Sequence, residues 1–148
     1  MDKASPGSSD RSDGYVTEID YVFKYYRWTN PQYLRLALLR AGIVPPRVET
    51  ACDLGFGQGV SLAIHAASGP ASWIGNDINP DHLAHAARLL SAAGVGAGLY
   101  EDPFVAFAER DDLPDLDFVV AHGIWSWVSD RNRAALVRLV ERLSLIHI

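Results

Sequence analysis

The sequence contains a single cysteine, Cys52, so no disulfide can form within the chain. No apolar run approaches the roughly 18 residues that a membrane-spanning helix requires. Residues 1–14 lack the apolar centre of a secretory signal. An unpaired cysteine without such a signal is typical of a protein from a reducing compartment. We therefore expect a cytoplasmic protein with no membrane partner, in which Cys52 is an inert residue of the core.

Basic residues are also few, with 13 Lys and Arg against 18 Asp and Glu and a net charge of −5 at pH 7. They are scattered along the chain, whereas nucleic-acid binding relies on clustered basic side chains. Two histidines, His82 and His85, are spaced to share one helix face, but no carboxylate or cysteine follows at ligand spacing. We therefore expect neither a nucleic-acid partner nor a metal site.

The remaining composition is that of one globular domain, with 148 residues of which 49% are hydrophobic. Residues 1–14 are rich in Ser, Asp and Gly, which predicts a disordered tail. Residues 15–47 form an aromatic-rich lead-in, with a helix that begins at Asn30-Pro31 and ends at Gly42. The aromatic part is either a lid over a ligand or a hydrophobic flap on the sheet. Its aromatic residues are Tyr15, Tyr21, Phe23, Tyr25, Tyr26, Trp28 and Tyr33.

Strand and helix signals alternate through residues 48–143, with strands expected near 49–54, 72–76, 97–100 and 116–121. Helices are expected at 60–67, from Asn79-Pro80, at 103–110 and from Asp130. Connections of this length are right-handed, so the strands should be parallel with helices on both faces. The predicted fold is α/β, a Rossmann-like three-layer αβα sandwich with strand order 3-2-1-4.

A glycine-rich turn, Asp53-Leu54-Gly55-Phe56-Gly57-Gln58-Gly59, connects the first strand to its helix. Alternating glycines let the backbone turn sharply and approach a ligand. The amides at the start of the helix favour a carboxylate, and the charge of Asp53 suits an ammonium group. By itself such a turn is equally well explained as a tight connection.

A second acid, Asp77, ends the next strand, where it can accept both hydroxyls of a ribose. Ile78 beside it can pack on an adenine face, and Glu101 and Asp102 at the end of the third strand can meet the adenine edge. Asp77 alone could be a helix cap or a surface acid. Together with the glycine turn, it favours a ligand with an amino-acid head and a nucleoside, such as S-adenosylmethionine.

Other nucleotide motifs are absent. The dinucleotide pattern G-x-G-x-x-G that starts at Gly55 would require glycine where Val60 stands, which argues against an NAD-dependent oxidoreductase. A phosphate-binding loop would require Gly-Lys followed by Ser or Thr, and the sequence has no such run.

Two motifs, DLGFGQG at 53–59 and GNDINP at 75–80, resemble the cofactor motifs of class I S-adenosylmethionine-dependent methyltransferases. The segments AHGIWSWVSD at 121–130 and YVTEIDYVFKYYRWTNPQYLRLALLRAGIVPP at 15–46 resemble a bacterial group that carries a methyltransferase regulatory domain after the catalytic domain. Some relatives in that group are protein-lysine methyltransferases. The resemblance covers residues 15–143.

The family fold has seven strands in the order 3-2-1-4-5-7-6, so the resemblance implies a chain truncated before strand five. Residues 144–148 are then a truncated or foreign end, and strand four is an exposed edge. We expect such a fragment to be inactive alone. The expected cofactor-binding residues are Asp53, Gly55, Phe56, Gly57, Gln58, Gly59, Asp77, Ile78, Glu101, Asp102, His122 and Gly123.

Methyl transfer is an in-line displacement in which the protein mainly positions the nucleophile and excludes water. His122 is the candidate general base or cofactor contact, or else a strand-end histidine bound to backbone. Trp125 and Trp127 either line the acceptor pocket or pack under the last helix. The segment lacks the Asn/Asp-Pro-Pro-Tyr pattern of methyltransferases that act on planar amino groups, which argues against base methylation.

The sequence thus predicts an S-adenosylmethionine-dependent methyltransferase that acts on a protein side chain or a small molecule. The main alternative is a non-catalytic module that binds the same cofactor for regulation.

Overall fold

The computed structural model describes residues 22–143, and the predicted tail at 1–14 and the segment at 144–148 lie outside this range. Four parallel strands form one sheet in the order β3-β2-β1-β4. They are β1 (Thr50–Leu54), β2 (Ser72–Asn76), β3 (Gly98–Tyr100) and β4 (Phe118–Val120). The predicted parallel α/β fold and its strand order are confirmed, and the described residues contain no fifth strand.

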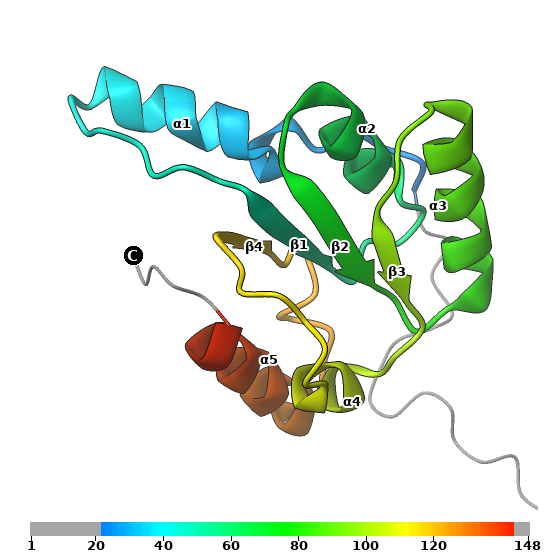
Figure 1. Ribbon diagram of the computed structural model, residues 1–148. Helices are drawn as coiled ribbons and strands as arrows, with labels where there is room; N and C mark the ends of the chain where they lie inside the picture. The colour runs from blue at the N-terminus through cyan, green and yellow to red at the C-terminus, as the bar shows by residue number, and fades with distance from the viewer. Residues whose placement is uncertain (1–21, 144–148) are drawn as a thin grey trace, which may run out of the picture.

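Helices cover both faces of the sheet, as Figure 1 shows: α2 and α3 lie on one face, and α4 and α5 on the other. The helical elements are η1 (Arg27–Thr29), α1 (Pro31–Arg40), α2 (Val60–Ser68), α3 (Pro80–Ala92), α4 (Phe104–Glu109) and α5 (Asp130–Leu143). Within residues 22–143, no helix has the length and apolar character needed to cross a bilayer.

Two Asn-Pro pairs start helices as the sequence predicts. The side chain of Asn30 accepts a hydrogen bond from the Gln32 amide, and that of Asn79 accepts one from Asp81. In both helices the following proline occupies the first position, where its missing amide hydrogen costs nothing. Both caps therefore fix where α1 and α3 begin.

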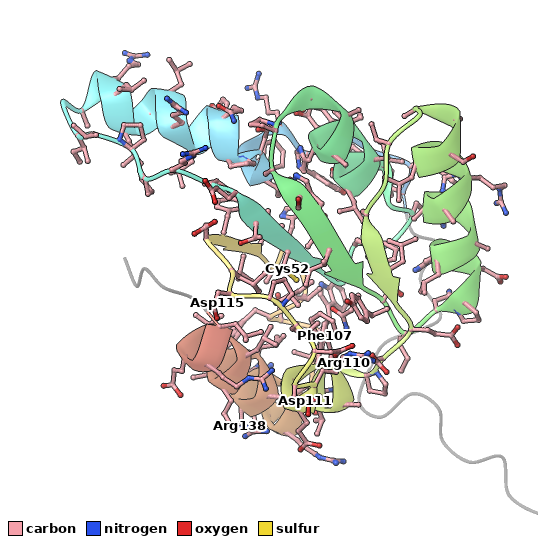
Figure 2. All side chains as sticks on the ribbon, in the orientation of Figure 1. Cys52, Phe107, Arg110, Asp111, Asp115 and Arg138 are labelled. Carbon is pink, nitrogen blue, oxygen red and sulfur yellow. The ribbon has the colours of Figure 1, made fainter. Side chains whose placement is uncertain are left out.

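The sheet separates two hydrophobic clusters. Cys52 on β1 packs on the α4–α5 side, together with Phe107 (both labelled in Figure 2) and Leu139. On the opposite side, Trp73 packs against Leu62 of α2 and Ala86 of α3. Burial, and secondarily the charge of Asp53, raises the pKa of the Cys52 thiol well above its usual value. The thiol is therefore an unreactive core group.

Strand β4 begins two residues later than predicted, and separate hydrogen bonds hold the two residues before it. The Leu116 amide donates to the Leu143 carbonyl at 2.7 Å. The Asp117 carboxylate accepts the amides of Glu49 and Thr50 at 2.9 and 3.0 Å. These bonds attach the start of β4 to the end of α5 and to the start of β1.

Helix α1 and residues 41–44 after it extend beyond the edge of the sheet, with apolar side chains in contact with solvent (Figure 1). Leu36, Leu39 and Ile43 are each more than half exposed, and Val44 is 89% exposed. This segment therefore adds little to the core within residues 22–143.

Candidate functional site

The carboxyl ends of β1 and β2 open into a cavity of about 290 Å³, close to the lower end of small-molecule sites. Its walls come from the glycine turn after β1, the segment after β2, the segment after β4, and residues 22–29. Of the expected cofactor residues, those that line it are Asp53, Gly55, Phe56, Gly57, Gln58, Asp77, Ile78, His122 and Gly123.

The three glycines of the turn adopt the left-handed conformation, with φ of 65° at Gly55, 57° at Gly57 and 71° at Gly59. A Cβ at Gly55 would lie 2.7 Å from Ile124 Cγ2, in the cavity wall. A Cβ at Gly59 would lie 2.4 Å from the Cβ of Ala86 on α3. Gly55 therefore makes room at the cavity, whereas Gly59 allows α2 and α3 to pack and does not line it.

The amides of this turn are largely used by the protein itself. Those of Gly55 and Phe56 donate to the Asn76 carbonyl at 2.9 and 3.3 Å, and that of Gly59 donates to the Phe56 carbonyl. The Gly57 amide donates to Asp77 Oδ2 at 2.8 Å. These four amides already have acceptors within the protein, whereas the expectation of a bound carboxylate concerned the amides at the start of α2.

Asp77 is buried and held by three donors. Besides Gly57, the Asn79 amide donates to Oδ1 at 2.9 Å, and His82 Nδ1 lies 3.1 Å from the same oxygen. A carboxylate offers about four lone-pair sites, so capacity for one further hydrogen bond remains toward the cavity. Sequence reasoning considered His82 only as a metal ligand and missed this pair. Within residues 22–143, no three metal-ligating side chains are grouped.

Asp53, at the cavity end of β1, is only 6% exposed. Burial, and secondarily the charge of Asp77, raises its pKa from 3.8 to about 7. Near neutral pH this carboxyl therefore exchanges a proton readily, and a cation in the cavity would favour its ionised form. Two buried acids thus face one ligand-sized space.

Residues 22–29 form the roof of the cavity, to which Val22, Lys24, Tyr26 and Thr29 contribute. Ser61 and His65, one turn apart on α2, anchor this roof segment. The Tyr26 amide donates to Ser61 Oγ at 2.9 Å, and Thr29 Oγ1 lies 2.9 Å from His65 Nε2. This placement favours the lid interpretation over a flap on the sheet; Tyr15 and Tyr21 lie outside the described residues.

The tautomer of His65 follows from its surroundings. The Thr29 hydroxyl donates its only proton to the Tyr26 carbonyl at 2.7 Å, so His65 Nε2 must be the donor to Thr29. Burial lowers the pKa of His65 to about 4, which keeps the ring neutral. The sequence offered no signal for this pair, whose members are 36 residues apart.

His122 follows β4 and lies at the cavity mouth. Its ring centroid is 4.2 Å from that of Tyr26 and 5.8 Å from that of Trp28. Among residues 22–143 it makes these ring contacts and no hydrogen bond. The alternative of a strand-end histidine bound to backbone is therefore not what the structure shows.

Glu101 and Asp102 were expected at the adenine edge, but neither is among the residues that line the cavity. Glu101 is exposed, and Asp102 accepts a bond from Arg110 Nη1 at 2.9 Å. Arg110 (labelled in Figure 2) also lies over the Tyr100 ring at 4.7 Å. The structure therefore does not bring these two residues into the cavity lining, and Asp102 is paired with Arg110 at the end of α4. Phe104 lines the cavity instead.

The two tryptophans after β4 lie in different places. Trp127 lines the cavity, whereas Trp125 lines a second groove between α1, β4 and α5. Each is 54% exposed, so neither is simply packed under the last helix. Of the two tryptophans, only Trp127 therefore lines the expected pocket.

Comparisons with known proteins give relatives but no matching family model. An uncharacterised protein of Synechocystis sp. is 35% identical over 136 residues, which are 88% of this chain and 27% of that protein. The structure of PKMT2 from Rickettsia typhi in complex with AdoHcy has 22% identity and a TM-score of 0.72, over 84% of this chain and 24% of that one. The plantazolicin methyltransferase BpumL in complex with SAH has 19% identity and a TM-score of 0.58, over 78% of this chain and 40% of that one.

The chain spans about a quarter to a half of the length of the curated relatives it matches. Its strand order and layers are those of these structural neighbours. The chain therefore has the Rossmann-like fold of S-adenosylmethionine-dependent methyltransferases.

Proposed function

We propose that the cavity binds S-adenosylmethionine and that the chain is the cofactor-binding part of a methyltransferase. The observation that carries the proposal is the pair of buried acids, Asp53 and Asp77, at the ends of neighbouring strands around one cavity. Two structural neighbours with the same fold are complexes with AdoHcy or SAH. Acids in these positions match a ligand that has two cationic groups and a ribose.

Residues that line the cavity can be matched to each group of such a ligand. Asp77 retains one acceptor site for a ribose hydroxyl, and Ile78 and Phe104 provide apolar surfaces for adenine. Asp53 is placed for the ammonium group, which would stabilise its ionised form. The left-handed turn at Gly55 and Gly57 leaves space beside the backbone. When bound, the cofactor supplies an activated methyl group on a sulfonium leaving group.

His122 and Trp127 are the residues we assign to the acceptor side. The His122 ring is exposed at the mouth of the cavity, where an imidazole can take a proton from an incoming nucleophile. Trp127 and Tyr26 offer aromatic surface around it. This arrangement supports transfer to a protein side chain or a small molecule that enters beside His122.

Calorimetry with S-adenosylhomocysteine tests the cofactor assignment. Asp77→Asn should weaken binding by about 10- to 100-fold, since it removes a charged acceptor worth about 1.5–3 kcal/mol. Asp81→Asn, which changes an exposed acid one turn away, is the matched control and should bind as the wild type does. Circular dichroism confirms that each variant is folded. Equal affinity of the Asp77→Asn variant and the wild type would contradict the proposal.

A further inference from the structure

We infer that Lys24 binds the carboxylate of the ligand's amino-acid part and so selects ligands that carry this part. The inference rests on the proposed function and adds a residue that the glycine and acid motifs do not include. The ligand's carboxylate would be stabilised by a partner of opposite charge, but the floor of the cavity presents two acids to it.

Most amides of the glycine turn are occupied. Four amides of the glycine turn donate to acceptors within the protein, one of them to Asp77 itself. The charge of Asp53 and Asp77 repels an anion at the floor of the cavity. A cation from another wall would therefore stabilise a carboxylate in this cavity.

Lys24 is the only Lys or Arg among the described residues that line the cavity. Its Nζ lies 5.6 Å from the centre of the Tyr26 ring, which lines the same wall. Among residues 22–143 it has no ion pair, unlike Arg110 and Arg133, whose charges are matched by nearby acids. Its ammonium group is therefore available to a ligand.

The roof segment fixes the direction of this side chain. Side chains alternate between the two sides of an extended chain. Val22, Lys24 and Tyr26 line the cavity. Phe23 and Tyr25, between them, make ring contacts with His85 on α3 and His65 on α2, at 5.0 and 5.6 Å.

The two aromatic contacts and the bond from the Tyr26 amide to Ser61 hold the backbone on both sides of Lys24. A shift of one residue in this segment would turn Lys24 away from the cavity and bring an aromatic ring in. The fold thus places a cation in the roof of the cavity that Asp53 and Asp77 also line.

A pair of ligands isolates the carboxylate contact. S-adenosylhomocysteine carries the amino-acid part, and 5′-methylthioadenosine is the same thioether nucleoside without it. Calorimetry would compare both ligands on the wild type, on Lys24→Met, which keeps the aliphatic stem, and on Arg27→Ala. Arg27 is a nearby cation that stacks on Tyr33 at 5.8 Å and does not line the cavity.

Lys24→Met should weaken S-adenosylhomocysteine binding about fivefold, the upper end expected for an exposed ion pair, and leave 5′-methylthioadenosine binding nearly unchanged. Arg27→Ala should leave both affinities unchanged. Equal losses for the two ligands, or no loss for either, would overturn the inference while the cofactor assignment stands. A wild-type protein that binds neither ligand would overturn the proposed function, and this inference with it.

Discussion

Asp53→Asn should make the folded protein more stable at about pH 8 and should lose this advantage in acid. The wild-type carboxyl has its pKa raised from 3.8 to about 7, first by burial and then by the charge of Asp77. Between these two values the folded state binds more protons than the unfolded state, so the free energy of unfolding decreases as the pH rises. The stabilising protonation is complete below pH 3.8 and is lost as the pH passes about 7.

The magnitude follows from the size of the shift. Each pKa unit corresponds to about 1.4 kcal/mol, so ionised Asp53 costs the folded protein at most about 4 kcal/mol above pH 7. The asparagine amide has the same shape and no charge, but its NH₂ group must also find acceptors in a buried place. We therefore expect a net gain of about 1–3 kcal/mol at about pH 8 and almost none at about pH 4.

Urea denaturation followed by circular dichroism measures this difference directly. The relevant quantity is the free energy of unfolding of the variant minus that of the wild type, at each pH, because acid effects from other groups then cancel. Asp111→Asn, which removes the carboxylate of an exposed acid in the loop after α4 (Figure 2), is the matched control. Parallel pH profiles for Asp53→Asn and the wild type would refute the reasoning.

Two further predictions concern the same turn. The affinity of the wild type for S-adenosylhomocysteine should rise about tenfold between about pH 6 and about pH 8, because the ligand ammonium favours ionised Asp53; calorimetry should find this trend absent from Asp53→Asn, and a flat wild-type profile would argue against the ammonium contact. Gly59→Ala should cost about 3 kcal/mol or more in thermal unfolding, since φ is 71° and the new Cβ would meet Ala86. Gly94→Ala, where φ is 68° and nothing lies within 4 Å, should cost only about 1–2 kcal/mol; equal losses would show that the contact with α3 is unimportant.

The sequence predicts those parts of the site whose position follows from where the strands and helices begin and end along the chain. Asp53 and the glycines follow directly after a buried strand, and Asp77 follows the next one, so the parallel topology alone brings them together. Asn79 likewise caps α3 through a bond to a residue two positions away. In each case the placement follows from a strand end or a helix cap that the local sequence marks.

The parts that the sequence does not predict depend on distant contacts. Lys24 reaches the cavity only because Ser61 and His65, more than 30 residues later, hold the roof segment. Asp102 does not line the cavity, and its carboxylate accepts a hydrogen bond from Arg110, which follows α4. No periodicity in the sequence marks such pairs, since each partner has an ordinary local environment. The three-dimensional fold is needed to find them.

The central place of β1 determines when the site can form. Its pairing with β2 closes a short loop, but its pairing with β4 joins residues 67 positions apart, as the bond from Thr50 to Asp117 shows. Pairs with long sequence separation form slowly, because the loss of chain entropy precedes the gain from contacts. The glycine turn and Asp77 can therefore take up their positions before β4 pairs with the other edge of β1. The cavity wall that contains His122 should therefore form last. The slowest folding phase should then be the one that produces a cavity able to bind its ligand.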